Sequence, residues 1–82
     1  MPKLPVVSGK KVIKLLSRLG YEIVRQKGSH VKMRINTRIG EHISVIPDHK
    51  ELSKGTLGDI LSDVSLYNAI PKDEVIEMLR KI

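Results

Sequence analysis

The sequence contains no cysteine, and this absence excludes disulfide bonds, cysteine-ligated zinc, iron–sulfur clusters and thiol nucleophiles. It also lacks phenylalanine and tryptophan, so Tyr21 and Tyr67 are its only large aromatic residues. The core must then be built from Leu, Ile, Val and Met, and recognition of RNA bases by stacking on exposed aromatics is not expected. No apolar run approaches the roughly 20 residues that span a bilayer, and the opening segment 1–5 has no secretory apolar region. The sequence therefore predicts a cytoplasmic protein without a membrane partner.

Acidic residues are scarce in the first two-thirds of the chain. The 82 residues carry 15 Lys and Arg against 9 Asp and Glu, a net charge of +6. Residues 1–56 have 12 basic and 4 acidic side chains, a balance of +8, whereas residues 57–82 have a balance of −2. Such a basic segment favours a polyanionic partner. The alternative is that Lys and Arg only keep a small domain soluble, and the directions in which they point must decide.

Apolar residues recur at helical spacing in three segments and alternate in the three segments between the first two helices. Ser8 is a candidate N-cap and Gly20 a candidate C-terminal glycine for the first helix. Pro47 cannot donate to a strand ladder and is expected to end the third strand. The expected elements are a helix at about 9–19, strands at about 21–26, 30–36 and 42–46, and helices at about 54–64 and 71–81.

This order predicts an α+β fold in a single domain at 1–82. It is the α-β-β-β-α topology of double-stranded-RNA-binding domains, with a three-stranded antiparallel sheet and an added C-terminal helix, a likeness of fold and not of function. In the third strand, Ile43 and Val45 are expected to face the core, with Ile35 opposite Ile43. The segment 65–70 is expected to be a linker.

The strongest local feature is a turn at 27–29 followed by strict alternation of polar and apolar residues. If the apolar members of this strand bury against the helices, His30 and the cations after it must share the opposite face. Gly28 permits a close backbone approach and Ser29 offers a hydroxyl, so this corner could hold a phosphate. The alternative is an ordinary polar face of a half-exposed sheet. The candidate phosphate-binding residues here are Lys27, Gly28, Ser29, Lys32 and Arg34.

A second candidate anion site is the start of the helix at 54–64, where Lys50, Lys54 and Thr56 gather around free backbone N–H groups. The spacing of a P-loop is absent, and an ordinary helix start capped by Ser53 is an equally good interpretation. The histidines give a weak metal signal, because His42 would lie roughly 20 Å from His30 at about 3.3 Å per residue. Two imidazoles without cysteine are a poor zinc site, so no metal and no cofactor are expected.

Several segments together resemble the HicA toxins, the small mRNA interferases of type II toxin–antitoxin modules. The segments that carry the resemblance are Val7–Lys10, Leu19–Tyr21, Arg25–His30, Pro47–His49 and Leu52–Leu57. Each is weak alone, and their order and spacing make the set specific.

The resemblance implies a double-stranded-RNA-binding-domain-like fold, cofactor-free cleavage of mRNA, and inhibition by a HicB-type antitoxin. The family's catalytic histidine maps onto His30, and His49 is a candidate second proton-transfer group. Metal-free RNA cleavage uses the substrate's 2′-hydroxyl as nucleophile with a general base and a general acid. Two other functions stay open: a module that holds duplex RNA without cutting it, and a subunit whose basic face docks an acidic protein.

Overall fold

The computed structural model describes residues 3–82. Residues 1 and 2, which belong to the predicted domain and to its opening segment, lie outside the described residues. A helix, three antiparallel strands and two further helices follow one another, so the predicted α+β fold is confirmed. No helix within residues 3–82 is long and apolar enough to cross a bilayer. The elements are α1 (Gly9–Leu19), β1 (Glu22–Lys27), β2 (His30–Thr37), β3 (Gly40–Pro47), α2 (Lys54–Asn68) and α3 (Lys72–Arg80).

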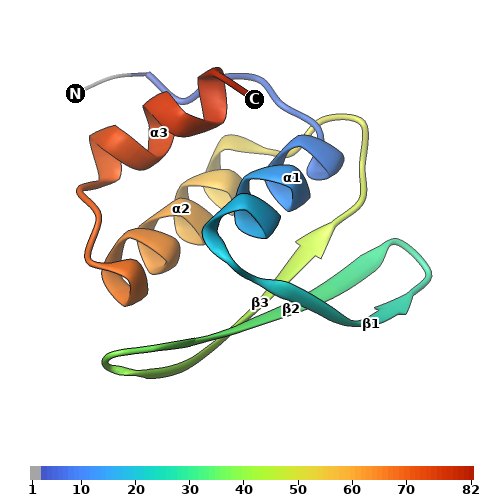
Figure 1. The fold of residues 1–82 in the computed structure, drawn as a ribbon. Helices are drawn as coiled ribbons and strands as arrows, with labels where there is room; N and C mark the ends of the chain where they lie inside the picture. The colour runs from blue at the N-terminus through green and yellow to red at the C-terminus, as the bar shows by residue number, and fades with distance from the viewer. Residues whose placement is uncertain (1–2) are drawn as a thin grey trace.

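The molecule has two layers, with the helices on one face of the sheet and the other face open (Figure 1). The strand order is β1-β2-β3, so β2 is central and β1 and β3 are edges. No side chain of β1 is buried, whereas β2 and β3 each bury alternate residues against the helices. The aliphatic core predicted from the composition fills the space between the layers. Its largest fully buried side chains are Leu15, Leu16, Met33, Ile46, Leu57, Leu61 and Leu79.

Both ends of α1 have the predicted caps. The Ser8 hydroxyl accepts a hydrogen bond from the Lys11 amide at 3.2 Å, which satisfies one of the free N–H groups of the first turn. Gly20 has φ = 107°, a left-handed conformation that glycine adopts without a steric penalty. The Tyr21 amide then donates to the Leu16 carbonyl at 3.0 Å, and the chain turns from α1 into β1.

Helix α2 is longer than expected, because it continues through most of the segment predicted to be a linker. It ends at Asn68, and Ala69 takes a left-handed conformation with φ = 53°. Ser65 closes this end twice: its carbonyl accepts from the Ile70 amide at 3.2 Å, and its hydroxyl donates to the Ile70 carbonyl at 2.5 Å. The other boundaries differ from the expected ones by at most two residues.

The predicted face of β3 was wrong. Ile35 pairs with His42 and not with Ile43, a shift of one residue in the register of β2 and β3. Because side chains alternate along a strand, this shift exchanges the two faces. His42 is therefore 5% exposed and faces the helices, whereas Ile43 and Val45 are 44% and 47% exposed on the open face.

A cluster of polar and aromatic side chains explains why a histidine is buried in β3. The Tyr21 hydroxyl lies 2.6 Å from His42 Nδ1, and the Asn68 amide group donates to the same hydroxyl at 3.0 Å. The ring of Tyr67 stacks on that of His42 with centroids 4.3 Å apart. Burial lowers the pKa of His42, although the negative charge of Asp63 opposes this change. Burial also raises the pKa of Tyr21. These partners satisfy the imidazole inside the fold.

Candidate functional site at the corner of α1, β2 and β3

Three segments that are distant in the sequence meet at one corner of the molecule: the β1–β2 turn, the end of β3 and the start of α1. The Asp48 amide donates to the Ser29 carbonyl at 2.5 Å, and the Gly9 amide donates to the His49 carbonyl at 2.9 Å. The Leu52 amide donates to the Val7 carbonyl at 2.9 Å. In Figure 1 the loop after β3 runs beside the start of α1 on the right-hand side. Backbone hydrogen bonds therefore fix this corner.

Gly9 makes the close approach between α1 and the end of β3 possible. A Cβ atom at this position would lie 1.9 Å from the carbonyl oxygen of Pro47 and 2.9 Å from the Cα atom of Asp48. Both neighbours are backbone atoms, so no side-chain rotation could relieve the contact. Only glycine fits here without a movement of the helix away from the strand.

His30 lies at this corner on the open face of the sheet. Its neighbours across the ladders are Lys27 on β1 and Pro47 on β3, and paired residues of antiparallel strands share a face. The flanking Val31 is buried, as the alternation predicts, while His30 is exposed. Gly28 supplies the positive φ of 58° that the turn before His30 requires. The imidazole is open to solvent beside a lysine.

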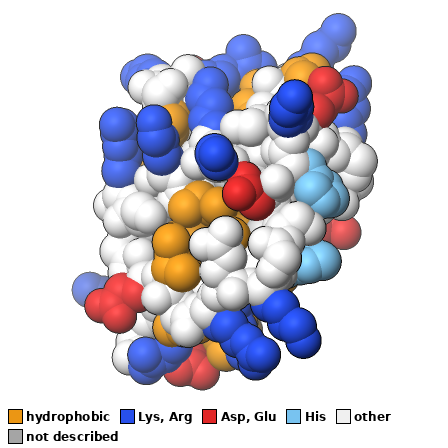
Figure 2. Space-filling view, turned by 90° about the vertical axis from the view of Figure 1, so that its right-hand side faces the viewer, with side chains coloured by type: hydrophobic (Ala, Val, Ile, Leu, Met, Phe, Trp, Pro, Cys, Tyr) orange, Lys and Arg blue, Asp and Glu red, His pale blue; other side chains and the backbone are white. Residues whose placement is uncertain are grey.

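His49 lines a shallow hollow of about 310 Å³ at the same corner, on the side of α1. Ser8, Lys10, Asp48 and Lys50 complete its lining. Viewed from the side shown in Figure 2, the molecule has histidine surface near Lys and Arg side chains. The exposed histidines within residues 3–82 are His30 and His49. Lys10 was not a predicted site residue. The sequence did contain one signal for it. Gly9 directly follows the N-cap, although alanine is the better helix former, and this choice of residue indicates a close contact beside Lys10.

Arg34 lies on the same face as His30 but is engaged elsewhere. It forms an ion pair with Glu41 on β3, and four residues of strand, about 13 Å at 3.3 Å per residue, separate it from His30. Lys32 lies between them, half-buried, with Val45 as its partner on β3. The open face therefore carries cations along β2, as the sequence predicted, and along β3 it carries the apolar Ile43 and Val45, which were predicted to face the core.

Lys54 and Thr56 lie at the start of α2, where Ser53 is the cap. The Ser53 hydroxyl accepts from the Thr56 amide at 3.2 Å and donates to the Thr56 hydroxyl at 3.0 Å. The Thr56 amide and hydroxyl thus have partners within the helix start, while Lys54 is exposed. This geometry is that of the ordinary capped helix start considered above.

The histidines do not gather into a metal-ligand cluster within the described part of the chain. No group of three or more His, Cys, Asp or Glu side chains there could hold an ion. His42 is buried on the helix-covered face with its Nδ1 atom bonded to Tyr21, whereas His30 and His49 are exposed.

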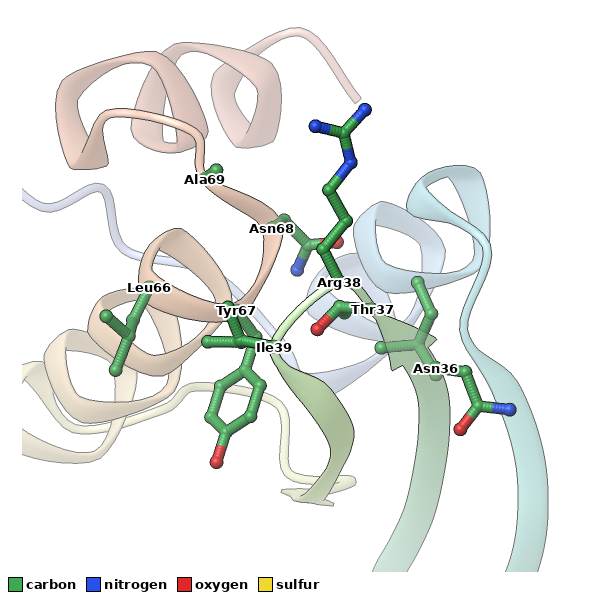
Figure 3. Close-up of a pocket in the computed structure, with 9 residues that line it drawn as sticks. Asn36, Thr37, Arg38, Ile39, Leu66, Tyr67, Asn68 and Ala69 are labelled. Atoms are coloured by element: carbon green, nitrogen blue, oxygen red, sulfur yellow. The ribbon is translucent and has the colours of Figure 1, made fainter.

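A larger hollow, of about 550 Å³, lies at the opposite end of the sheet. Leu66 and Tyr67 of α2 face the β2–β3 turn, with Arg38 and Ile39, across it (Figure 3). Arg38 is the one charged residue of its lining, and none of the lining residues is a histidine, aspartate or glutamate. The exposed histidines of residues 3–82 lie instead at the corner of His30 and His49.

The chemistry available at the corner is proton transfer beside fixed positive charge. Exposed imidazoles can act as general acids or bases near neutral pH, and the lysines can balance the charge of a phosphate.

A comparison with protein families places most of the chain in a known family model. The model of the HicA toxins of bacterial toxin–antitoxin systems matches residues 9–66. The matched region is more than half of the chain. It holds α1, the whole sheet and most of α2, and it excludes α3. No curated protein and no solved structure matches the chain.

Proposed function

The chain belongs to the HicA toxin family of bacterial toxin–antitoxin systems, and from this membership we propose that it is an endoribonuclease that cleaves mRNA. One observation carries the proposal: the register that pairs His30 with Pro47 brings both surface histidines to one corner. The hydrogen bond between the Asp48 amide and the Ser29 carbonyl holds their two segments together.

The proposed reaction uses the 2′-hydroxyl of the RNA as nucleophile on the adjacent phosphate. A general base removes the 2′ proton as the new oxygen–phosphorus bond forms, and a general acid protonates the 5′ oxygen as its bond to phosphorus breaks. The products are a 2′,3′-cyclic phosphate and a free 5′-hydroxyl, so no cofactor enters the balance. DNA lacks the 2′-hydroxyl and is not a substrate for this chemistry.

We assign one proton transfer to His30 and the other to His49, which follows Pro47 by two residues. The charge that develops on the phosphate requires nearby cations and N–H donors. Arg34, Lys54 and Thr56 remain predicted RNA contacts at the edge of this region. The residues proposed to hold the phosphates at the corner are Lys10, Lys27, Gly28, Ser29, Lys32 and Lys50.

A toxin–antitoxin toxin has an antitoxin partner, and we propose that this partner is a HicB-type protein. An enzyme that cleaves mRNA acts in the cytoplasm, where its substrate and its inhibitor are made. Covering the open sheet face around His30 and Lys32 with a surface that carries carboxylates would block the reaction. Complementary charge would also speed the encounter of the two proteins.

The test compares His30→Ala with Asn36→Ala, a change at another exposed position on the same face of β2. Each purified protein is incubated with RNA and with the same RNA carrying 2′-deoxy sugars. We expect cleavage by the Asn36→Ala control, no cleavage by His30→Ala, and binding without cleavage of the 2′-deoxy strand. Thermal unfolding checks that both variants are folded, since an exposed strand position contributes little packing.

Three outcomes separate the possible functions. Cleavage that ends in a 2′,3′-cyclic phosphate and needs His30 supports the proposal. Retention of duplex RNA without cleavage by the wild-type protein identifies a binding module instead. A folded His30→Ala protein that cleaves as fast as wild type would overturn the assignment of this histidine.

A further inference from the structure

A row of cations follows α1 away from the histidine corner. Lys10, Lys14 and Arg18 recur every four residues, so they lie on one side of the helix about 6 Å apart along its axis at 1.5 Å per residue. All three are exposed, and neither they nor the neighbouring Lys11 form an ion pair within residues 3–82. The positive charges of this row therefore face solvent.

Three shallow hollows connect this row to the corner. The hollow of His49 shares Ser8 and Lys10 with a second hollow of about 290 Å³, which Lys11, Lys14 and Ile82 also line. The second hollow shares Ile82 with a third of about 200 Å³ between α1 and the end of α3. We call the second and third hollows together the α1 groove. Its charged lining residues are Lys10, Lys11, Lys14, Arg18 and Lys81.

The charges of Lys10 and Lys11, at the start of the α1 groove, oppose the stability of α1. Lysines in the first turn lie at the positive end of the helix dipole, and no acidic residue balances them there. Like charges four residues apart also repel each other. The lining contains five cationic side chains and no acidic side chain, and the one negative group beside them is the C-terminal carboxylate of Ile82. A bound polyanion would therefore relieve this repulsion.

We propose that the α1 groove binds the sugar–phosphate backbone of the RNA strand that leaves the histidine corner, an inference that rests on the proposed ribonuclease function. The lining contains no aromatic side chain on which bases could stack, so the groove contacts phosphates and does not read sequence. In this proposal RNA crosses α1 as well as the open sheet face. Most of the RNA contacts predicted from the sequence lie on the sheet and its β1–β2 turn, and none lies on α1.

The test uses the double variant Lys14→Gln with Arg18→Gln, which changes two groove cations outside the corner. Its matched control is Lys72→Gln with Arg38→Gln, which removes the same charge from α3 and from the β2–β3 turn. Binding of single-stranded RNA is measured by fluorescence anisotropy against salt concentration, with His30→Ala added to every protein to prevent cleavage. Two RNA lengths are compared: one of a few nucleotides and one long enough to cross α1.

For the long RNA, we expect the groove variant to bind more weakly than the control variant, with a slope of log Kd against log salt that is shallower by about 1.4. This figure assigns about 0.7 to each of the two phosphates of a single strand that the groove variant no longer neutralises. The difference should shrink as the RNA is shortened to the corner. Equal affinities and slopes for the two double variants would overturn the groove. If the groove variant binds the antitoxin more weakly but binds RNA as well as the control does, the RNA-binding role of the groove is also overturned, in favour of a protein partner.

A separate cleavage assay with the His30-containing protein distinguishes failure of this inference from failure of the proposed function. If the His30-containing protein cleaves RNA and the two double variants bind long RNA equally well, the groove alone is rejected and the ribonuclease is retained. Absence of cleavage, together with weaker long-RNA binding by the groove variant, rejects the ribonuclease and retains the groove.

Discussion

Replacing Gly9 by alanine tests the corner with the smallest possible change. The added Cβ would lie 1.9 Å from the Pro47 carbonyl oxygen, whereas real Cβ contacts essentially never fall below 3.0 Å. Because backbone lies on both sides, α1 and the end of β3 must separate by about 1 Å. This movement acts directly on the hydrogen bond from the Gly9 amide to the His49 carbonyl, now 2.9 Å.

The expected loss of stability follows from these contacts. Overpacking of a tight site costs about 1–3 kcal/mol, and weakening one hydrogen bond adds up to about 1 kcal/mol. The better helix propensity of alanine returns less than about 1 kcal/mol. A net loss of about 2 kcal/mol corresponds to a fall in Tm of roughly 8–16 °C for a domain of this size.

Gly58→Ala is the matched control, because it makes the same substitution inside α2. There the new Cβ would lie 3.5 Å from the Leu4 Cδ1 atom, an ordinary van der Waals contact. Helix propensity then dominates, and Tm should rise. Thermal unfolding followed by circular dichroism measures both variants under the same conditions.

The Gly9→Ala variant also links the packing of the corner to the proposed activity. A misplacement of about 1 Å at a reacting centre can reduce the rate about 10²-fold, so Gly9→Ala should cleave RNA far more slowly at temperatures where it is folded. A Tm at or above that of wild type would refute the packing argument. A folded Gly9→Ala protein with full cleavage would refute the role of the corner.

Three further predictions use other parts of the molecule. Burial lowers the pKa of His42 in the folded state. Below the unfolded pKa of about 6.5, the unfolded chain therefore binds more protons than the folded protein. The free energy of unfolding should be full above that pH and should fall as the pH drops toward the folded pKa. Urea unfolding from pH 7.5 to 5 measures this loss, and His42→Gln should flatten it. RNA cleavage should persist in excess EDTA, and loss on chelation with recovery on added Mg²⁺ or Zn²⁺ would show that a metal takes part. Lys32→Glu should weaken antitoxin binding strongly while Glu74→Lys with Glu77→Lys changes it little; calorimetry showing the reverse would place the antitoxin on α3.

Much of the fold could be predicted from local signals. The helical stripe and the caps of α1 involve residues within one helix, and Ser8 and Gly20 take the predicted roles. The alternation in β2 buries Val31 and Met33, as expected. Each of these features depends on neighbours in the sequence, so the sequence shows them directly.

The face of β3 could not be predicted in the same way. Local alternation favours burying Ile43 and Val45, and only residues far along the chain reverse that preference. Tyr21 and Tyr67 supply the partners that make a buried His42 acceptable. The contact of Gly9 with the end of β3 is equally non-local. The sequence thus indicated that His30 would be exposed but not that the start of α1 would lie beside the loop of His49.

The buried histidine and the exposed one are connected through the register of the sheet. With Ile43 and Val45 turned inward, the ladder would shift by one residue, and His30 would lie opposite Asp48. Two features oppose this shift: the bond between Tyr21 and His42, and the short β2–β3 turn, in which Thr37 pairs with Gly40 and donates from its hydroxyl to the Gly40 carbonyl at 2.8 Å. A shifted ladder would need a longer turn and would leave a histidine where a polar partner is missing. The polar cluster at one end of the sheet therefore fixes the residues that meet at the other end, where we propose that RNA is cut.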